Sequence, residues 1–242
     1  MFMPALQTVL KLVYPSRCLI CGGLVETDFG LCGPCWRDTP FISGLVCDCC
    51  GVPLIGDSED AEFCDDCLTT PPAWSQGRAG LVYKDNGRKL VLMLKHGDRH
   101  DIALPAAVWM ARQIRPLLRE NMVAVPIPLH FRRHFKRRYN QSALLSRALS
   151  RELGIDHAPD ALERLRHTAS LEGKTREQRY TTLSDVLRVR PSRVAAIAGR
   201  PVLIVDDVLT SGATLCAATE ACLAAGASEV CVSVLARVAK EA

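Results

Sequence analysis

The sequence predicts an α/β protein in which helices cover both faces of a parallel β-sheet, preceded by a small cysteine-rich domain. Three features support this prediction. Residues 202–205 are four β-prone apolar residues in a row, typical of a strand buried on both faces of a parallel sheet. Residues 214–225 follow with small apolar side chains at helical spacing, and Gly226 ends them. Four C-x-x-C pairs lie earlier, between residues 18 and 67.

Composition and charge divide the chain in two. Its 242 residues are 48% hydrophobic and 5% aromatic, which indicates a globular protein with an aliphatic core. The net charge of +4 conceals an asymmetry, because residues 1–77 carry three basic and ten acidic side chains, or −7, and the remainder carries +11. We expect one module over residues 1–72 and an α/β domain over residues 73–242, joined at Thr70-Pro71-Pro72.

Residues 1–14 have apolar side chains at helical spacing, which predicts a short amphipathic helix. The segment has neither a basic n-region nor a small-residue cleavage site, and it is too short to span a bilayer. The sequence therefore predicts no membrane span and a cytoplasmic protein, in which thiols stay reduced. Paired cysteines in that compartment favour metal binding over disulfides.

The C-x-x-C pairs predict two structural zinc sites. The two-residue spacer lets both sulfurs of a pair reach one ion, and eight thiolates suffice for two tetrahedral Zn²⁺ ions. We favour sequential pairing, with an interleaved arrangement as the alternative; buried or redox-active cysteines explain four pairs in one window less well. Cys49 breaks the spacing and is left out. The predicted ligands are Cys18, Cys21, Cys32 and Cys35 for one ion and Cys47, Cys50, Cys64 and Cys67 for the other.

The second half of the cysteine-rich segment is strongly acidic. Residues 48–67 contain seven acidic side chains and no basic one, so this surface should repel the phosphates of a nucleic acid. We expect it to face a protein partner or the basic domain of its own chain.

Five segments between residues 79 and 128 have sequence patterns that predict their structure. Residues 79–84 predict a short strand, and residues 86–96 and 102–119 predict helices. Residues 98–101 combine Asp, Arg and His, and a polar connection between helices explains them better than a metal or catalytic cluster. Residues 122–128 predict the first strand of the main sheet, closed by prolines.

A basic run follows that strand. Between residues 121 and 151 there are seven Arg or Lys side chains and no acidic one. Taken alone, such a run is as well explained by a solvated face. Its position favours a ligand, because ligands in open α/β sheets bind beyond the carboxyl ends of the strands. The residues assigned to pyrophosphate or a nucleic-acid backbone are Arg132, Arg133, Arg137 and Arg138.

The remaining elements complete the α/β pattern. Residues 142–153 predict an amphipathic helix ended by Gly154, and residues 186–189 and 229–238 predict strands. Residues 162–179 are basic and poorly patterned, and they fit a lid over the site as well as an exposed connector. Three further cysteines fall on core positions and are interpreted as small buried hydrophobes, namely Cys216, Cys222 and Cys231.

The end of the 202–205 strand carries the strongest functional signal. Asp206 and Asp207 follow it and can accept hydrogen bonds from ribose hydroxyls or lie near Mg²⁺. Gly212 removes a Cβ from the turn, and the unpaired amides of a helix N-terminus can hold a phosphate. No lysine follows the glycine, which excludes the ATP-type loop. An ordinary strand–turn–helix with a hydroxyl N-cap is the alternative, and the hydroxyls available are Thr210, Ser211 and Thr214.

This stretch resembles the fingerprint that type I phosphoribosyltransferases use to bind phosphoribosyl pyrophosphate (PRPP): an apolar run, two acidic residues and a Thr/Ser-Gly-x-Thr turn. The resemblance implies a type I phosphoribosyltransferase-like fold, with Asp206 and Asp207 as the catalytic pair on the ribose hydroxyls and Mg²⁺ bridging the pyrophosphate. Lys95 would join the arginines on that pyrophosphate. The residues implied for PRPP and its 5-phosphate are Val208, Leu209, Thr210, Ser211, Gly212, Ala213 and Thr214.

Nearly the whole chain resembles the ComF/GntX family of phosphoribosyltransferase-like proteins linked to competence for DNA uptake. The likeness rests on the cysteine pairs, the Val125-Pro126-Ile127-Pro128-Leu129 strand end, the run into Arg138-Tyr139-Asn140-Gln141, and the 206–214 stretch. Three positions depart from the family pattern: Arg138 stands for a glycine, Leu171 for a glutamine, and a threonine after Arg179 for an asparagine. These departures weaken what the resemblance implies about the lid.

Two functions stay open from the sequence. The first is an active phosphoribosyltransferase, in which a nucleophile attacks C1 of PRPP and pyrophosphate leaves. The second is a non-enzymatic module that keeps the PRPP pocket as a sensor or binds single-stranded DNA. No residue of the chain identifies an acceptor for the ribose.

Overall fold

The structure is a computed structural model that describes residues 15–26, 30–129, 139–165 and 186–239. Every structural statement below concerns those residues. The helix predicted over residues 1–14 and the basic residues between 130 and 138 lie outside them. Within the described part of the chain, no helix is both long and apolar enough to cross a membrane.

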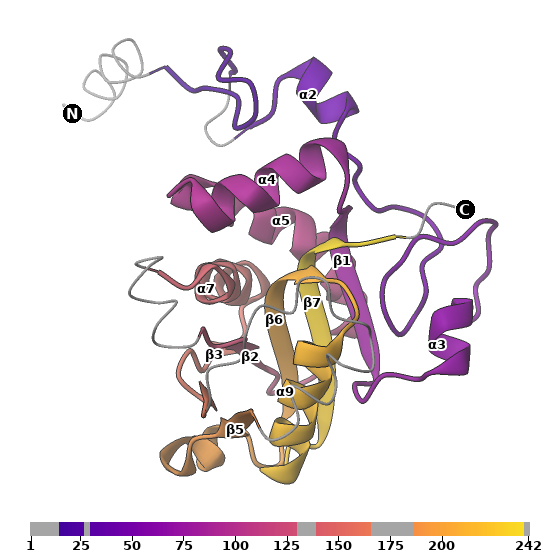
Figure 1. The fold of residues 1–242 in the computed structure, drawn as a ribbon, viewed down its shortest axis with the longest axis vertical. Helices are drawn as coiled ribbons and strands as arrows, with labels where there is room; N and C mark the ends of the chain where they lie inside the picture. Colours follow the sequence, from indigo (N-terminus) through magenta and orange to yellow (C-terminus); the bar gives the residue numbers. More distant parts are fainter. Residues whose placement is uncertain (1–14, 27–29, 130–138, 166–185, 240–242) are drawn as a thin grey trace.

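A five-stranded sheet forms the centre of the molecule, in the order β1-β7-β6-β2-β3 (Figure 1). Its strands are β1 (Gln76–Val82), β2 (Val123–Pro126), β3 (Asp156–His157), β6 (Pro201–Leu209) and β7 (Glu229–Arg237). All four pairings are parallel. The predicted parallel sheet is therefore confirmed.

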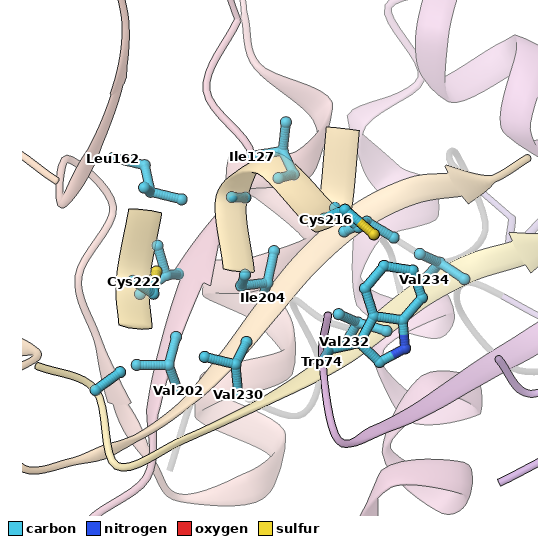
Figure 2. Packing of buried hydrophobic residues seen from close by; sticks show 14 of the residues in the cluster. Trp74, Ile127, Leu162, Val202, Ile204, Cys216, Cys222, Val230, Val232 and Val234 are labelled. Atoms are coloured by element: carbon cyan, nitrogen blue, oxygen red, sulfur yellow. The ribbon is translucent and has the colours of Figure 1, made fainter. Parts of the chain in front are cut away.

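Helices cover both faces of this sheet, as predicted. On one face, α4 (Asp85–His96), α5 (Ala103–Ile114) and α7 (Gln141–Leu153) pack on Leu203 and on neighbouring strands. On the other face, α9 (Ala213–Ala224) packs on the valines of β6 and β7. Figure 2 shows the second core, where Cys216 and Cys222 lie among these valines. Both cysteines and Cys231 are buried, as predicted.

Two sequence predictions about this domain are wrong in detail. The first strand of the main sheet is β1, and the strand at residues 122–128 comes second. β1 pairs with the last strand of the chain, from Gln76 opposite Cys231 to Val82 opposite Arg237, and sequence spacing gives no sign of so distant a partner. The helix expected over residues 102–119 ends at Ile114, because Pro116 lacks the amide that would continue it. The 3-10 turns η1 (His100–Ile102) and η2 (Arg115–Leu117) flank it.

A second, two-stranded sheet lies beside the first. Here β4 (Leu162–Arg164) pairs antiparallel with β5 (Leu187–Val189), and the 3-10 turn η3 (Pro191–Ala196) follows. The segment predicted as an unpatterned lid or connector over residues 162–179 thus begins with a strand. Residues 166–185 lie outside the described part, so its remainder stays a prediction.

The cysteine-rich region has little regular structure beyond the short helices α2 (Gly33–Arg37) and α3 (Asp65–Thr69). It packs directly on the α/β domain. Phe41 forms an antiparallel bridge with Leu81, and the amide of Ile42 donates to the carbonyl of Gly80 at 3.1 Å. These contacts cover the outer edge of β1, which would otherwise expose unpaired backbone groups.

Candidate functional site

A cleft lies at the carboxyl ends of β2 and β6, where ligands of open α/β sheets bind. It consists of two adjoining cavities of about 280 Å³ and about 350 Å³ that share Lys95, Asp206 and residues of the 210–214 turn. We call them the acidic lobe and the turn lobe. The acidic lobe is lined by Tyr83, Lys95, Ile127, Pro128, Leu129, Gln141, Ser142, Arg164, Asp206, Asp207, Val208, Thr210 and Thr214.

The two carboxylates lie within β6, which runs on to Leu209, and not after its end as the sequence suggested. Both acids contact the first turn of α7, where Gln141 donates to Asp207 and Ser142 donates to Asp206. Both acids line the acidic lobe, and of the two only Asp206 also lines the turn lobe.

Asp207 is almost fully buried, and one of its carboxylate oxygens contacts two side chains. Its Oδ2 accepts a hydrogen bond from Nε2 of Gln141 at 3.0 Å and lies 3.2 Å from Nζ of Lys95. Lys95 comes from the last turn of α4 and reaches both lobes. The structure thus pairs Lys95 with Asp207, and the place of Lys95 on a pyrophosphate stays a prediction.

Asp206 has a different environment. Its Oδ1 accepts from Oγ of Ser142 at 2.7 Å and from the amide of Asp207 at 2.9 Å. Burial raises the pKa of Asp206 to about 7; the charge of Asp207 acts in the same direction, and the hydrogen bond from Ser142 opposes both. This carboxyl consequently changes charge near neutral pH.

The turn lobe is built around the start of α9. Gly212 is the N-cap residue at φ +81°, so the N-cap position itself carries no side chain. The alternative of an ordinary hydroxyl N-cap is therefore not what the structure contains. The first turn of α9 lies beside a cavity lined by Thr210, Ser211 and Thr214. The first amides of a helix are donors for an anion.

The residues on either side of the basic run lie in the described part of the chain. Leu129, just before it, lines the acidic lobe, whereas Arg132, Arg133, Arg137 and Arg138 lie outside the described residues. Tyr139, just after it, donates its hydroxyl to the carbonyl of Leu94 and packs edge-on against His100 at 4.1 Å between ring centroids. Residues 98–101 form a polar connection, as expected, in which Arg99 pairs with Asp101 at 2.7 Å.

Several residues of the cleft were missed by sequence reasoning. Gln141 and Ser142 begin α7, where Asn140 caps the helix by accepting from the amide of Ser142 at 3.0 Å. Gln141 is only 3% exposed, and its Oε1 has no hydrogen-bond partner among the described residues. The signal was present, because the helix start follows the basic run directly, but spacing alone does not assign a glutamine to a site. Arg164 also lines the cleft from β4.

The cysteines form two groups of four, in the sequential arrangement that we favoured. Cys18, Cys21, Cys32 and Cys35 make one group and Cys47, Cys50, Cys64 and Cys67 the other, with all sulfurs of a group within 4.8 Å of one another. Cys21 and Cys32 have sulfurs 3.7 Å apart, and Cys50 and Cys64 have sulfurs 3.8 Å apart. Tetrahedral zinc with bonds of about 2.3 Å requires sulfurs about 3.8 Å apart, so both groups fit the ion.

Each group contains one readily ionised thiol. A hydrogen bond from Cys50 lowers the pKa of Cys47 to about 4 against the effect of burial. At Cys18 burial raises the pKa, but backbone amides of Cys21, Cys32 and Ile20 outweigh it and bring the pKa to about 6. Thiolate is the form that binds metal. Cys49 belongs to neither group, as predicted.

Sheet, turn and acidic pair together define a phosphoribosyltransferase-type domain carrying a cysteine-rich N-terminal module. Comparison with known families agrees. The family described as "Phosphoribosyl transferase domain" matches residues 103–242, and the one described as "Double zinc ribbon domain" matches residues 9–68. The chain belongs to the phosphoribosyl transferase domain family, joined to a double zinc ribbon, and the predicted ComF/GntX resemblance is confirmed.

Relatives match over nearly their whole length. "DNA utilization protein YhgH" of Escherichia coli (strain K12) is 30% identical over 93% of this chain and 99% of that protein. "Competence protein F" of Haemophilus influenzae is 29% identical over 91% of this chain and 96% of that protein. A solved structure described as the allosteric regulatory enzyme of purine biosynthesis aligns over 60% of this chain and 30% of that chain, with a TM-score of 0.40 and 16% identity, too distant to bear on the site.

Proposed function

We propose that the cleft binds a ribose 5-phosphate of the PRPP class with Mg²⁺, and that the protein serves the handling of DNA taken up in competence. One observation carries the ligand: the start of α9, with a glycine at its N-cap, and the acids of β6 open into the same two-lobed cleft. A phosphate and a diol on one pentose need donors and acceptors within a single cleft. The printed names of the relatives support the role in DNA handling.

The residues divide between the two ends of such a ligand. The amides and hydroxyls of the 210–214 turn would hold the 5-phosphate, and Asp206 and Asp207 would accept from the ribose hydroxyls. Lys95 would sit at the pyrophosphate, together with the arginines of the basic run. Asp206 and Asp207 could also lie near Mg²⁺, which would stabilise the charge that develops on the pyrophosphate.

Turnover, where it occurs, is a transfer at C1 of the ribose. The bond from C1 to the pyrophosphate oxygen breaks and its electron pair stays on that oxygen, while a lone pair of the acceptor forms the new bond to C1. Such a reaction needs cations at the leaving group more than a strong base. Lys95 supplies one cation in the described part of the chain.

Calorimetry tests this function. PRPP with Mg²⁺ should bind the wild-type protein, and the Asp206→Asn/Asp207→Asn variant should lose at least roughly tenfold in affinity, because each lost charge-assisted hydrogen bond contributes about 1.5–3 kcal/mol. Absence of binding to the zinc-loaded wild type would refute it. A parallel assay of pyrophosphate release with candidate bases and amines then separates an enzyme from a PRPP-sensing adaptor.

A second candidate function is binding of single-stranded DNA along the basic run, favoured by the same relatives' names. Changing Arg132, Arg133, Arg137 and Arg138 to alanine should flatten the salt dependence of binding, which amounts to about −0.7 in log–log slope per phosphate neutralised. Unchanged affinity and slope in that variant would exclude the run as the binding surface.

We also propose a protein partner for the acidic loop at residues 57–62 and structural zinc for the cysteine groups. Residues 57–62 are exposed, and their charge suits a basic protein partner, whereas Asp48 is taken up by Arg78 of its own chain at 2.6 Å. The two cysteine groups would each hold one structural Zn²⁺, which replaces a core that so short a region cannot build. Reduced thiols are required for this, consistent with the cytoplasm as the expected compartment.

A further inference from the structure

We propose that the second cysteine group, residues Cys47, Cys50, Cys64 and Cys67, braces the 210–214 turn through Trp74 and Arg237, so that zinc in this group sets the affinity of the turn for a phosphate. The ligand part of this inference rests on the proposed function. Trp74 and Arg237 are positioning residues here, since they act on the turn and not on the ligand.

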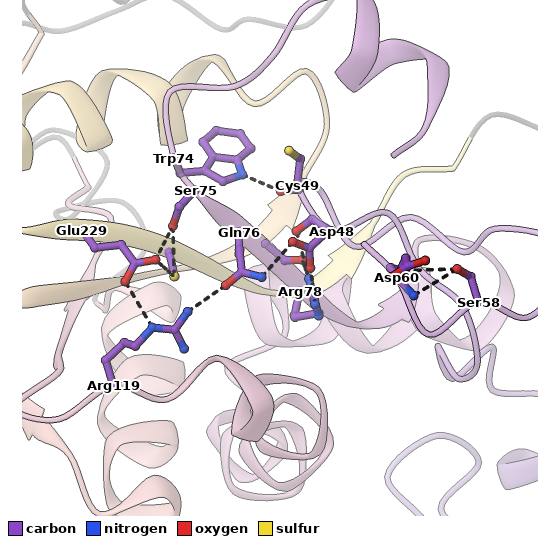
Figure 3. A network of polar contacts seen from close by, with 12 residues as sticks. Asp48, Cys49, Ser58, Asp60, Trp74, Ser75, Gln76, Arg78, Arg119 and Glu229 are labelled. Atoms are coloured by element: carbon purple, nitrogen blue, oxygen red, sulfur yellow. Dashed lines mark hydrogen bonds and ion pairs between the residues drawn. The ribbon is translucent and has the colours of Figure 1, made fainter. Parts of the chain in front are cut away.

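Trp74 joins the two sites by direct contact. It is 5% exposed, and its Nε1 donates to the carbonyl of Cys49, between the ligand cysteines, at 2.6 Å (Figure 3). Its ring lies beside Val232 and Val234 in Figure 2. A Cβ placed on Gly212 would lie 2.8 Å from Cη2 of this ring. The indole is therefore wedged between the cysteine loop and the glycine that opens α9.

Arg237, at the end of β7, makes the second connection. Its Nη1 donates to the carbonyls of Leu209 at 3.2 Å and Thr210 at 3.1 Å, at the entrance to the turn. Its Nη2 lies 3.8 Å from Sγ of Cys50. When Cys50 binds zinc it is a thiolate, and a guanidinium donor to that sulfur is the kind of outer contact that fixes a ligand in place.

The cysteine loop is itself fixed to the sheet, so a displacement there cannot be absorbed locally. A Cβ on Gly77 would lie 2.4 Å from the carbonyl of Cys49, which shows how closely the loop approaches β1. Asp48 binds Gln76 at 2.8 Å and Arg78 at 2.6 Å, both on β1 (Figure 3). Close-packed interiors transmit such strain.

The first cysteine group provides a natural control, because it contacts the other face of the domain. The carbonyl of Cys35 accepts from Nδ2 of Asn86 on α4 at 3.2 Å, and Leu19 packs with α4 and α5. The second group instead shares its hydrophobic cluster with Leu209 and Leu215 at the turn. Metal loss at the first group should therefore leave the turn unchanged.

The expected loss of affinity follows from the fraction of molecules in which the turn is competent to bind. If loss of the brace leaves the competent turn about one tenth populated, the apparent dissociation constant rises about tenfold. Amides of residues 207–216 should exchange with deuterium faster by a similar factor, because the opened turn no longer protects them.

The experiment compares matched variants of the full chain with zinc counted in each. Cys64→Ser removes a half-buried ligand of the second group, and Cys32→Ser removes a half-buried ligand of the first. Trp74→Phe is matched by Trp109→Phe, a buried tryptophan on α5. Hydrogen exchange at residues 207–216 and affinity for ribose 5-phosphate are measured in all four and in Arg237→Gln.

Faster exchange and weaker binding in Cys64→Ser, Trp74→Phe and Arg237→Gln, but in neither control, is the expected result. Equal exchange at residues 207–216 in Cys64→Ser and Cys32→Ser would overturn the coupling. Should Cys64→Ser unfold, the zinc-retaining Trp74→Phe and Arg237→Gln decide, and wild-type exchange in both refutes it. If the wild type binds no ribose phosphate, the proposed function fails, while the exchange data still decide the coupling.

Discussion

Neighbouring acids in the cleft occupy unequal environments, and this inequality sets their roles. Asp207 faces Lys95 and Gln141 from inside the fold, whereas Asp206, which forms no ion pair among the described residues, keeps a pKa near neutrality. An acid that changes charge near neutral pH can, once ionised, accept from a ribose hydroxyl or approach a cation, whereas an acid already paired with a lysine can hold the geometry of the site. We therefore expect ligand affinity to rise with pH as Asp206 ionises.

The same pKa makes a prediction for stability. In the unfolded chain an aspartate ionises near pH 4, but folded Asp206 keeps its proton until about pH 7, so its contribution to stability falls as pH rises between these values. Asp206→Asn should raise the melting temperature by roughly 3 °C or more at pH 8 and leave it unchanged at pH 4. Scanning calorimetry at both pH values checks this.

Asp207→Asn is the control for that experiment, since it leaves Lys95 without its carboxylate and should lower the melting temperature at pH 8. An equal gain from both substitutions, or a gain for Asp206→Asn that persists at pH 4, would mean that Asp206 is not the group that titrates.

Gly212 allows a second test on a single residue. An alanine at position 212 would have to adopt φ +81°, and its Cβ would meet the ring of Trp74. At Gly154, where φ is +68°, an added Cβ would have nothing within 4 Å. Gly154→Ala should cost about 1–2 kcal/mol, the left-handed backbone alone, and Gly212→Ala clearly more. Denaturant unfolding compares the two, and equal losses would show that Trp74 does not press on the turn.

The sequence identified site residues with a specific chemistry but missed residues whose role depends on contacts across the fold. The acids and the glycine could be named from the chain because their chemistry is specific, and Lys95 was named only through the family resemblance. Gln141, Ser142, Trp74 and Arg237 could not, since an amide, a hydroxyl, an indole and one arginine among many acquire roles only through contacts across the fold.

Among the elements, α7 positions the acid pair through its first turn. Asn140 caps this helix and also donates from Nδ2 to the carbonyl of Ile127 at 3.0 Å, which ties the helix start to the end of β2. The next two residues, Gln141 and Ser142, hold the acids. A loose start of α7 would thus release both carboxylates.

Asn140→Ala should therefore lower stability by about 1 kcal/mol, the usual cost of a lost cap, and weaken ligand binding as well. Asn140→Ser keeps a capping oxygen and should recover the stability but not the contact to Ile127. Chemical denaturation and ligand titration of both variants check this. An unchanged ligand affinity in Asn140→Ala would show that the helix cap does not contribute to ligand binding.

Long periodic elements were predictable, whereas the pairing partners of the edge strands were not. The strand at β6 and the helices α4, α7 and α9 followed from apolar runs and spacing, with glycines near their ends. The sheet position of β1 and the β4–β5 pair depend on partners far away in sequence. Local pattern carries no information about such pairings.

At the scale of the whole molecule, the two modules share their cores. Cys47, Cys50 and Cys67 belong to the cluster beneath α9, and Leu19 belongs to the cluster beneath α4, α5 and α7. The charge asymmetry suggested separate modules, and the boundary at residues 72–73 remains a prediction. The packing implies that metal binding and stability of the whole chain are linked.

The two cysteine groups predict two zinc ions per chain. Because metal binding and stability are linked, the melting temperature should fall by roughly 5 °C or more when a strong chelator removes these ions. Metal analysis and calorimetry on one sample provide both numbers. Fewer than two ions in freshly purified, reduced protein, or melting insensitive to chelation, would contradict the assignment of both cysteine groups to zinc.

A crystal structure with PRPP and Mg²⁺ tests the central claim most directly. We expect the 5-phosphate to lie within hydrogen-bond distance of the amides of residues 212–215 and the ribose hydroxyls to contact Asp206 and Asp207. A pentose bound elsewhere, or density at the turn for a side chain where the phosphate should lie, would contradict it.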